Sequence, residues 1–174
     1  MKGKDELVQE PISFDPVITK EQIKAVADLA EIVWHEHYDL IIGKEQVDYM
    51  IGKFQSVSAM ITQMEEDSYE YYKIISPTGD AGYFAFRREE EGIFLSKIYI
   101  LRQFRGRNYA RKALDFMEEI CKTENLKKIW LTVNRNNETS IKIYENLGFK
   151  KIRTQVADIG SGYVMDDFVM EKAI

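Results

Sequence analysis

Four arginines follow an apolar run and precede a helical pattern, and this order of residue types suits the binding of an anion. Residues 93–101 are nearly all apolar, as in a strand buried on both faces, and the arginines after them are Arg102, Arg105, Arg107 and Arg111. Backbone N–H groups at the start of a helix carry partial positive charge, so a loop folded around them can hold a pyrophosphate. Arginine side chains can add charge-assisted hydrogen bonds. The alternative is a solvated basic loop before an ordinary helix.

Two residues of this loop tolerate backbone conformations that most side chains disfavour. Gly106 allows the main chain to approach a ligand closely, and Asn108 is the kind of non-glycine residue that most readily adopts a left-handed conformation. The helix that follows has an apolar stripe that includes Ala110 and Cys121. We therefore expect Cys121 to be an inert core thiol.

A second pattern lies on a later predicted helix. Asn137 and Tyr144 are seven residues apart, about two helical turns, and therefore share one helix face. Gly148 is expected to end this helix as the residue after its C-cap. Tyr144 also falls at the apolar spacing of the helix, so a packed core tyrosine is the alternative to a functional one.

The remaining patterns predict the elements that position these residues. Thr19 and Gln22 form a capping box that begins a helix to about residue 38, and a broken helical segment covers 44–66. The predicted strands lie within 11–18 and at 69–76, 81–87, 93–101, 129–133, 149–156 and 163–171. The strand–helix–strand unit at 93–133 favours a right-handed parallel crossover, while hairpins link most of the other strands. We therefore expect a mixed α/β sheet.

Length and composition are those of one ordinary globular domain. The chain has 174 residues, of which 45% are hydrophobic and 30% charged. These values exclude wholesale disorder and predict a single domain over residues 1–174, with a polar, flexible arm at 1–10. The 24 basic and 29 acidic residues leave a net charge of −5. An acidic chain is a poor partner for nucleic acid, and it mildly favours cationic substrates.

Several kinds of site and location are not expected. One cysteine cannot form an internal disulfide, and the histidines, His35 and His37, are far from it, so we expect no metal centre. No apolar stretch approaches the roughly 18 residues of a membrane span, and no apolar run of a signal peptide follows the charged N-terminus. These features predict a cytoplasmic protein that does not bind membranes.

Together, the two motifs resemble the GNAT superfamily of N-acetyltransferases. In that family a turn between a strand and a helix carries Arg/Gln-x-x-Gly-x-Gly/Ala, and here the turn reads Arg105-Gly106-Arg107-Asn108-Tyr109-Ala110. A later helix of the family reads Asn-x-x-Ala-x-x-x-Tyr-x-x-x-Gly-Phe, matched here by Asn137, Ser140, Tyr144, Gly148 and Phe149. The motif detail extends over residues 93–172. Asn108 replaces the first motif glycine, and its tolerance of positive φ makes that change acceptable.

The resemblance implies a single-domain GNAT-like α/β fold with a mostly antiparallel mixed sheet and a splayed parallel strand–helix–strand unit. It also implies acetyl-CoA as cosubstrate, no metal, and direct attack of an amine on the thioester. The residues that it places against the coenzyme are Ile98, Tyr99, Ile100, Arg105, Gly106, Arg107, Asn108, Tyr109, Ala110, Arg111, Asn137 and Ser140. It places the hydroxyl of Tyr144 at the sulfur, where a proton donor helps the thiolate to leave.

The sequence leaves open which group would deprotonate the amine. The strand at 93–101 contains no carboxylate, and the candidates before it or on the first helix are Glu90, Glu91, His35, Glu36 and His37. His37 lies on an apolar stripe, so a buried structural histidine is the alternative for it.

The acceptor is expected to be a small primary amine such as a polyamine. The reason is the ending over residues 160–172, which resembles that of the bacterial spermidine/spermine acetyltransferases. The alternatives are an amine of a peptide or protein, an aminoglycoside, or a non-catalytic module that binds acyl-CoA as a sensor. Because relatives of this fold are often dimeric, a homodimer is an expected assembly.

Overall fold

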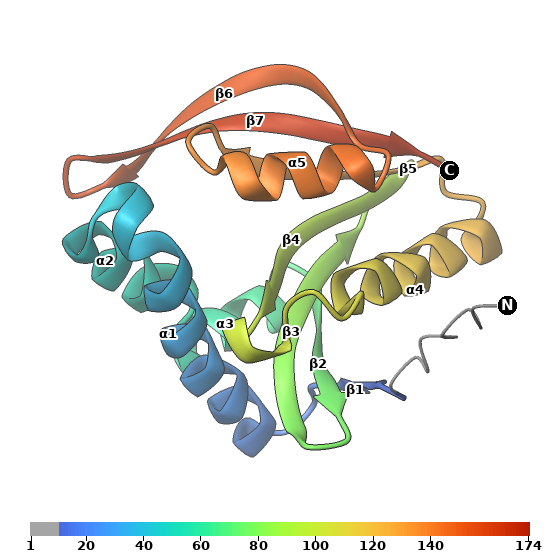
Figure 1. Ribbon diagram of the computed structural model, residues 1–174, viewed down its shortest axis with the longest axis horizontal. Coiled ribbons are helices and arrows are strands. Elements are labelled where there is room, and N and C mark those ends of the chain that lie inside the picture. Colours follow the sequence, from blue (N-terminus) through green and yellow to red (C-terminus); the bar gives the residue numbers. More distant parts are fainter. Residues whose placement is uncertain (1–10) are drawn as a thin grey trace, which may run out of the picture.

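A seven-stranded mixed sheet runs through the molecule (Figure 1). The computed structural model describes residues 11–174, so the predicted arm at 1–10 lies outside the described residues. The strand order is β1-β2-β3-β4-β5-β7-β6. The strands are β1 (Ser13–Pro16), β2 (Tyr69–Ser76), β3 (Gly79–Arg88), β4 (Gly92–Ile100), β5 (Lys128–Asn134), β6 (Lys150–Gly160) and β7 (Tyr163–Ala173).

Helices cover both faces of this sheet. They are α1 (Lys20–Ile42), α2 (Lys44–Phe54), α3 (Val57–Glu65), α4 (Tyr109–Glu124) and α5 (Glu138–Asn146), with a short 3₁₀ turn, η1 (Arg102–Phe104), after β4. Among residues 11–174, no helix is both long and apolar enough to cross a membrane.

The first helix begins as predicted and ends later. The N–H of Gln22 donates to Thr19 Oγ1 (3.2 Å) and the N–H of Thr19 donates to Gln22 Oε1 (2.9 Å), which completes the capping box. The helix passes residue 38 because Tyr38 and Ile42 still pack against the core, and Gly43 ends it with a φ of 87°. The broken segment at 44–66 is confirmed as two helices, α2 and α3.

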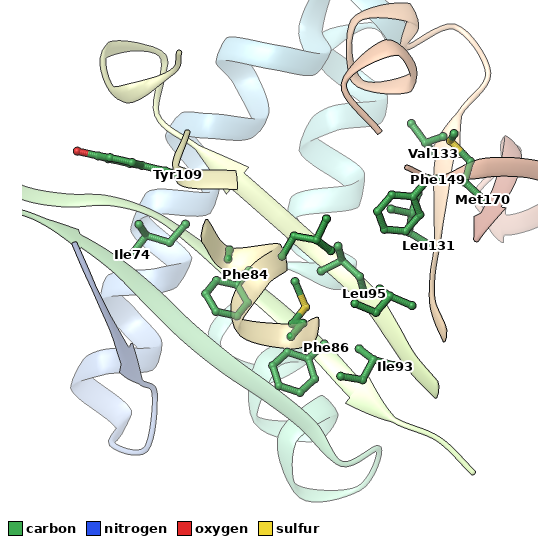
Figure 2. Close-up of a cluster of buried hydrophobic side chains, with 14 of the residues drawn as sticks. Ile74, Phe84, Phe86, Ile93, Leu95, Tyr109, Leu131, Val133, Phe149 and Met170 are labelled. Atoms are coloured by element: carbon green, nitrogen blue, oxygen red, sulfur yellow. The ribbon is translucent and has the colours of Figure 1, made fainter. Parts of the chain in front are cut away.

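The sheet separates two hydrophobic cores. On one face, α1, α2 and α3 pack around buried side chains such as Val26, Val47 and Tyr83. On the other face lie α4 and α5, and Figure 2 shows that core. Its labelled side chains include Phe84, Phe86, Ile93 and Leu95 of β3 and β4, and Leu131, Val133, Phe149 and Met170 from the β5–β7 side. Because successive strand residues point to opposite faces, one strand can contribute to both cores.

The parallel pair β4 and β5 is joined over only a short stretch. Residues 92–94 pair with residues 128–130, and beyond them the two strands diverge (Figure 1). A β-bulge in the β3–β4 ladder leaves Ser96 without a partner in register, close to the point of divergence. Bulges bend a strand and increase its twist. The predicted splayed strand–helix–strand unit is therefore confirmed, with α4 as its crossover helix.

Candidate active site

A cavity of about 230 Å³ lies where β4 and β5 diverge. The main chain of β4 beyond residue 94 has no β5 partner here, so part of its hydrogen-bonding edge faces the opening. We refer to the part formed by Arg105 and Ala110 as the loop side, and to the part formed by Met165 and Asp167 as the β7 side. The predicted site residues that line the cavity are Ile98, Tyr99, Ile100, Arg105, Ala110, Asn137, Ser140 and Tyr144.

The loop side has the backbone geometry that its sequence predicts. Gly106 has a φ of 77°, and Asn108 has a φ of 63° and a ψ of 17°, in the left-handed region. The N–H of Lys112 donates to the carbonyl of Asn108 (3.0 Å), so the helical ladder of α4 begins there. The N–H groups of Ala110 and Arg111 precede this first bond and have no acceptor within the helix. The start of α4 can therefore receive an anion.

Arg102, Arg105 and Arg111 are held by partners on α1, β4 and α4. The Arg105 side chain lines the cavity, and its Nε donates to the carbonyl of Ile100 (2.9 Å). The main-chain N–H of Arg102 donates to Glu36 Oε2 (3.0 Å), and its guanidinium donates to the Glu36 carbonyl (3.0 Å). Glu36 therefore ties the loop to α1. Arg111 pairs with Asp115 (3.0 Å) on the first turns of α4.

Asn137 joins α5 to α1 at the wall of the cavity. Its Oδ1 accepts from the N–H of Ser140 (3.2 Å), which makes it the N-cap of α5. This bond orients the amide, so its Nδ2 group is the one that lies 3.0 Å from Nε2 of His37. An amide N–H can only donate, and Nε2 of His37 therefore accepts and carries no proton. The pKa of His37 is lowered by burial and by the charge of Arg105, which favours the neutral ring.

Tyr144 lines the cavity from α5 and also packs in the core. Its ring meets that of Phe149 edge-on, with centroids 5.7 Å apart. Burial raises the pKa of Tyr144, so its hydroxyl stays protonated at neutral pH and can donate a proton. The two interpretations of this residue are thus compatible, since packing holds the ring while the side chain borders the cavity.

Aromatic rings form the wall of the cavity on the α1 side. Trp34 and Tyr38 have ring centroids 4.6 Å apart, and Trp34 and Tyr99 have centroids 5.4 Å apart. Burial raises the pKa of both Tyr38 and Tyr99, which keeps their hydroxyls neutral. The wall therefore offers ring faces and neutral hydroxyls, a surface compatible with a cation.

The β7 side contains a carboxylate that sequence reasoning missed. Asp167 is 3% exposed, and its Oδ1 is buried and accepts no hydrogen bond from residues 11–174. Burial raises its pKa to about 6, the neighbouring charge of Asp166 adds to this, and a hydrogen bond with Thr132 opposes it. The alternation of the strand could have indicated this residue. Asp167 lies two residues from Met165 and two from Val169, so it shares their inward-facing side of β7.

Most of the predicted base candidates lie elsewhere. Glu90 and Glu91 border a separate hollow at the start of β4, and Glu36 holds the loop. His35 lies between Asp39 (2.9 Å) and Asp48 (3.3 Å), on the α1–α2 corner. Of the candidates, His37 lines the cavity. Within the described part of the chain, no cluster of three or more His, Cys, Asp or Glu side chains could hold a metal ion.

Cys121 has the surroundings that its sequence position predicts. It lies on the buried face of α4 and is fully buried in the core. Burial raises the pKa of its thiol to about 11, so the reactive thiolate is disfavoured.

Family comparison agrees with this geometry. The model of the acetyltransferase (GNAT) family matches residues 34–149, which is about two thirds of the chain. The chain therefore belongs to the GNAT family of N-acetyltransferases. Its fold is that of enzymes that transfer an acetyl group from an acyl-CoA.

Solved structures share the whole fold at low sequence identity. The PaiA N-acetyltransferase of Thermoplasma acidophilum in complex with coenzyme A is 19% identical, with a TM-score of 0.77 over 94% of this chain and 99% of that one. A chimera of the Vibrio cholerae spermidine N-acetyltransferase SpeG and hSSAT is 15% identical, with a TM-score of 0.65 over 93% and 95%. The ribosomal-protein-S18-alanine N-acetyltransferase of Escherichia coli is 13% identical, with a TM-score of 0.69 over 94% of both chains. These likenesses show the fold, whose members act on different acceptors.

No curated protein matches the chain in a sequence comparison.

Proposed function

We propose that this acetyltransferase moves the acetyl group of acetyl-CoA to a small primary amine, such as a polyamine, by direct attack of the amine on the thioester. The observation that carries the proposal is the cavity itself. One space is lined by the start of α4, the open edge of β4, Tyr144 and Asp167. These are the groups that a thioester, a leaving thiolate and an incoming ammonium require.

The coenzyme would be bound largely by main-chain groups. The edge of β4 at Ile98, Tyr99 and Ile100 has no β5 partner, so it can pair with the amide groups of the pantetheine arm as a strand would. Residues 105–111 would hold the pyrophosphate, with N–H groups of the first turn of α4 directed at it. Asn137 and Ser140 would border the arm from the start of α5.

Tyr144 would supply the proton for the leaving sulfur. Attack by an amine expels a thiolate, and a positioned proton donor lowers the barrier to that step. A buried phenol whose pKa is raised is fully protonated when it is needed. No protein nucleophile is required, because the enzyme brings amine and thioester together in one orientation.

The dimensions and charge of the site favour a small cationic acceptor. A cavity of about 230 Å³ has room for a slender amine next to the acetyl group, and its β7 side has a carboxylate. The net charge of −5 also attracts cations rather than anions. Polyamines meet these requirements, and one structural neighbour is named as a spermidine N-acetyltransferase.

The test is acetyl-CoA-dependent release of CoA across a panel of polyamines, amino acids, aminoglycosides and short peptides, with product masses. We expect the highest kcat/KM with a polyamine or a similar small amine. Tyr144→Phe should lower kcat about 100-fold or more, while acetyl-CoA still binds.

Two results would contradict the proposal. Preferred acetylation of a peptide amine or an aminoglycoside would replace the proposed acceptor class. An unchanged kcat in Tyr144→Phe would remove the tyrosine from the reaction.

A further inference from the structure

We infer that Asp167 is the residue that receives the acceptor's ammonium group and takes a proton from it, so that the amine attacks as the free base. The inference rests on the proposed function, because it assigns a role within the same cavity. It comes from the structure alone, since the carboxylates considered from sequence lie outside the cavity.

Asp167 is a buried acid with unused bonding capacity. The residue is 3% exposed, and its Oδ1 accepts no hydrogen bond from any residue between 11 and 174. A buried polar atom without a partner is costly, and a buried charge more so. Because Asp167 lines the cavity, its carboxylate can receive a ligand there, and a carboxylate prefers a cationic donor.

The groups that face Asp167 lack a compensating cation. Tyr38 of α1 interacts with it electrostatically, Thr132 of β5 donates a hydrogen bond to it, and Asp166 adds negative charge. The nearby Arg135 is paired with Asp166 instead (3.1 Å). An ammonium group that enters the cavity would supply the missing positive charge, and the aromatic wall around Tyr38 would favour it further.

His37 is a poorer acceptor for this proton. It is the other titratable candidate on the cavity wall, but its Nε2 already accepts the amide N–H of Asn137 (3.0 Å). The proton of the neutral ring is then on Nδ1, which leaves no lone pair open. Tyr144 is protonated and serves as a donor. Asp167 remains as the group with an open lone pair.

The proton transfers balance around the two residues. An N–H proton passes from the ammonium to the Asp167 carboxylate, which leaves a neutral amine. The lone pair of the amine forms the C–N bond with the thioester carbonyl carbon, and the electrons of the C–S bond leave on sulfur, which takes the proton of Tyr144. The new nitrogen centre returns a proton to the Tyr144 oxygen. Asp167 then releases its proton to solvent, so one proton is freed for each acetyl group transferred.

The test compares Asp167→Asn with Asp166→Asn in the full-length chain. Asp166 is a matched control because it is the adjacent carboxylate, pairs with Arg135 and is half exposed. With acetyl-CoA and the best amine of the panel, we expect Asp167→Asn to lower kcat/KM at pH 7 about 100-fold, and Asp166→Asn to change it by less than about threefold.

The pH profile separates proton transfer from a structural role. Asp167→Asn can use only amine that is already neutral, so its deficit should shrink as the pH rises past the pKa of the amine, at about 10. A weakly basic amine, such as methoxyamine, should show a much smaller deficit at pH 7. Asp167→Ala provides a second variant, in which added formate should restore part of the turnover.

Each contrary outcome has a distinct meaning. A deficit that is equal at every pH and for both kinds of amine would overturn the proton-transfer role, and wild-type kcat/KM in Asp167→Asn would overturn the inference altogether. Either result would leave the acetyltransferase function in place. If the wild-type protein acetylates no amine in the panel, the proposed function fails, and the role of Asp167 fails with it. Binding of acetyl-CoA and an unchanged or higher thermal midpoint verify that each variant is folded.

Discussion

The two sides of the cavity are built in opposite ways. The loop side is a run of consecutive residues, 105–111, whose backbone conformation is set locally by Gly106 and Asn108. Its charged side chains have partners, such as Glu36 for the loop and Asp115 for Arg111. The β7 side depends on Asp167, whose Oδ1 has no hydrogen-bond partner among residues 11–174.

In the proposed function, the loop side binds the coenzyme and the β7 side binds the acceptor. Main-chain groups would bind the coenzyme, and local sequence is enough to shape them. A buried carboxylate oxygen without a partner lowers stability, and the ammonium group that we propose as its ligand would compensate for this cost.

The largest expected effect is on stability, at the β7 side. The pKa of Asp167 in the folded protein is about 6, above its ordinary value of 3.8. The folded state therefore binds this proton more tightly than the unfolded state, so stability rises as the pH falls from about 6 to about 4 and is lost again as the pH rises. The contribution is roughly 3 kcal/mol. Urea unfolding at pH 4 and pH 7 should show a smaller difference between the two pH values in Asp167→Asn than in the wild type.

If the difference between pH 4 and pH 7 is the same in both proteins, the Asp167 carboxylate is already compensated. The contrast between the two sides of the cavity would then disappear. Asp166→Asn is again the control, because Asp166 is half exposed and paired with Arg135.

The next effect is on the loop side and acts through the backbone. Asn108→Val places a β-branched side chain at a φ of 63°, which costs about 1–2 kcal/mol in the left-handed region. The strain should weaken binding of CoA about tenfold, measured by titration calorimetry. Asn108→Gly accepts the same φ and should bind CoA like the wild type. Equal affinity in both variants would show that the left-handed turn does not hold the pyrophosphate.

A smaller effect is expected at Asn137, where the two sides meet. Asn137→Ala removes the N-cap of α5 and should lower the free energy of unfolding by about 1 kcal/mol. Asn137→Ser keeps a capping hydroxyl, but its shorter side chain cannot reach His37. Compared with Asn137→Ala, it should therefore restore most of the stability and little of the turnover. Full turnover in Asn137→Ser would mean that this residue acts only as a cap.

The smallest effect is expected at Glu36. Glu36→Gln keeps an oxygen that can accept from the N–H of Arg102 but removes the charge, so the loop should loosen slightly. We expect the KM for acetyl-CoA to rise about two- to fivefold at unchanged kcat, consistent with less than about 1 kcal/mol for a partly exposed contact. Glu31→Gln, an exposed change on the same helix, is the control. A fall in kcat would instead indicate that Glu36 takes part in catalysis.

Much of the fold could be predicted because the sequence patterns that indicate its helices and strands are local. The capping box at Thr19, the two-helix segment at 44–66 and the strands at 69–88 follow from apolar spacing and turn residues. The end of α1 could not be placed from such signals, since Tyr38 and Ile42 extend the helix by packing against the other elements. The contacts that stabilise this additional turn of α1 involve residues that are distant in sequence.

The backbone geometry of the loop side follows from local sequence. Gly106 and Asn108 are residue types that tolerate the positive φ of this turn, and the motif spacing then places Asn137 and Tyr144 on one helix face. The surroundings of Asp167 and Glu36, by contrast, depend on tertiary packing. The sequence alone does not distinguish one carboxylate from another. The role of a carboxylate depends on whether folding leaves it in water, pairs it with a neighbour, or buries it without a partner. That outcome is set by the elements packed around it, here α1, β5 and β7 for Asp167, and these come together only in the folded chain.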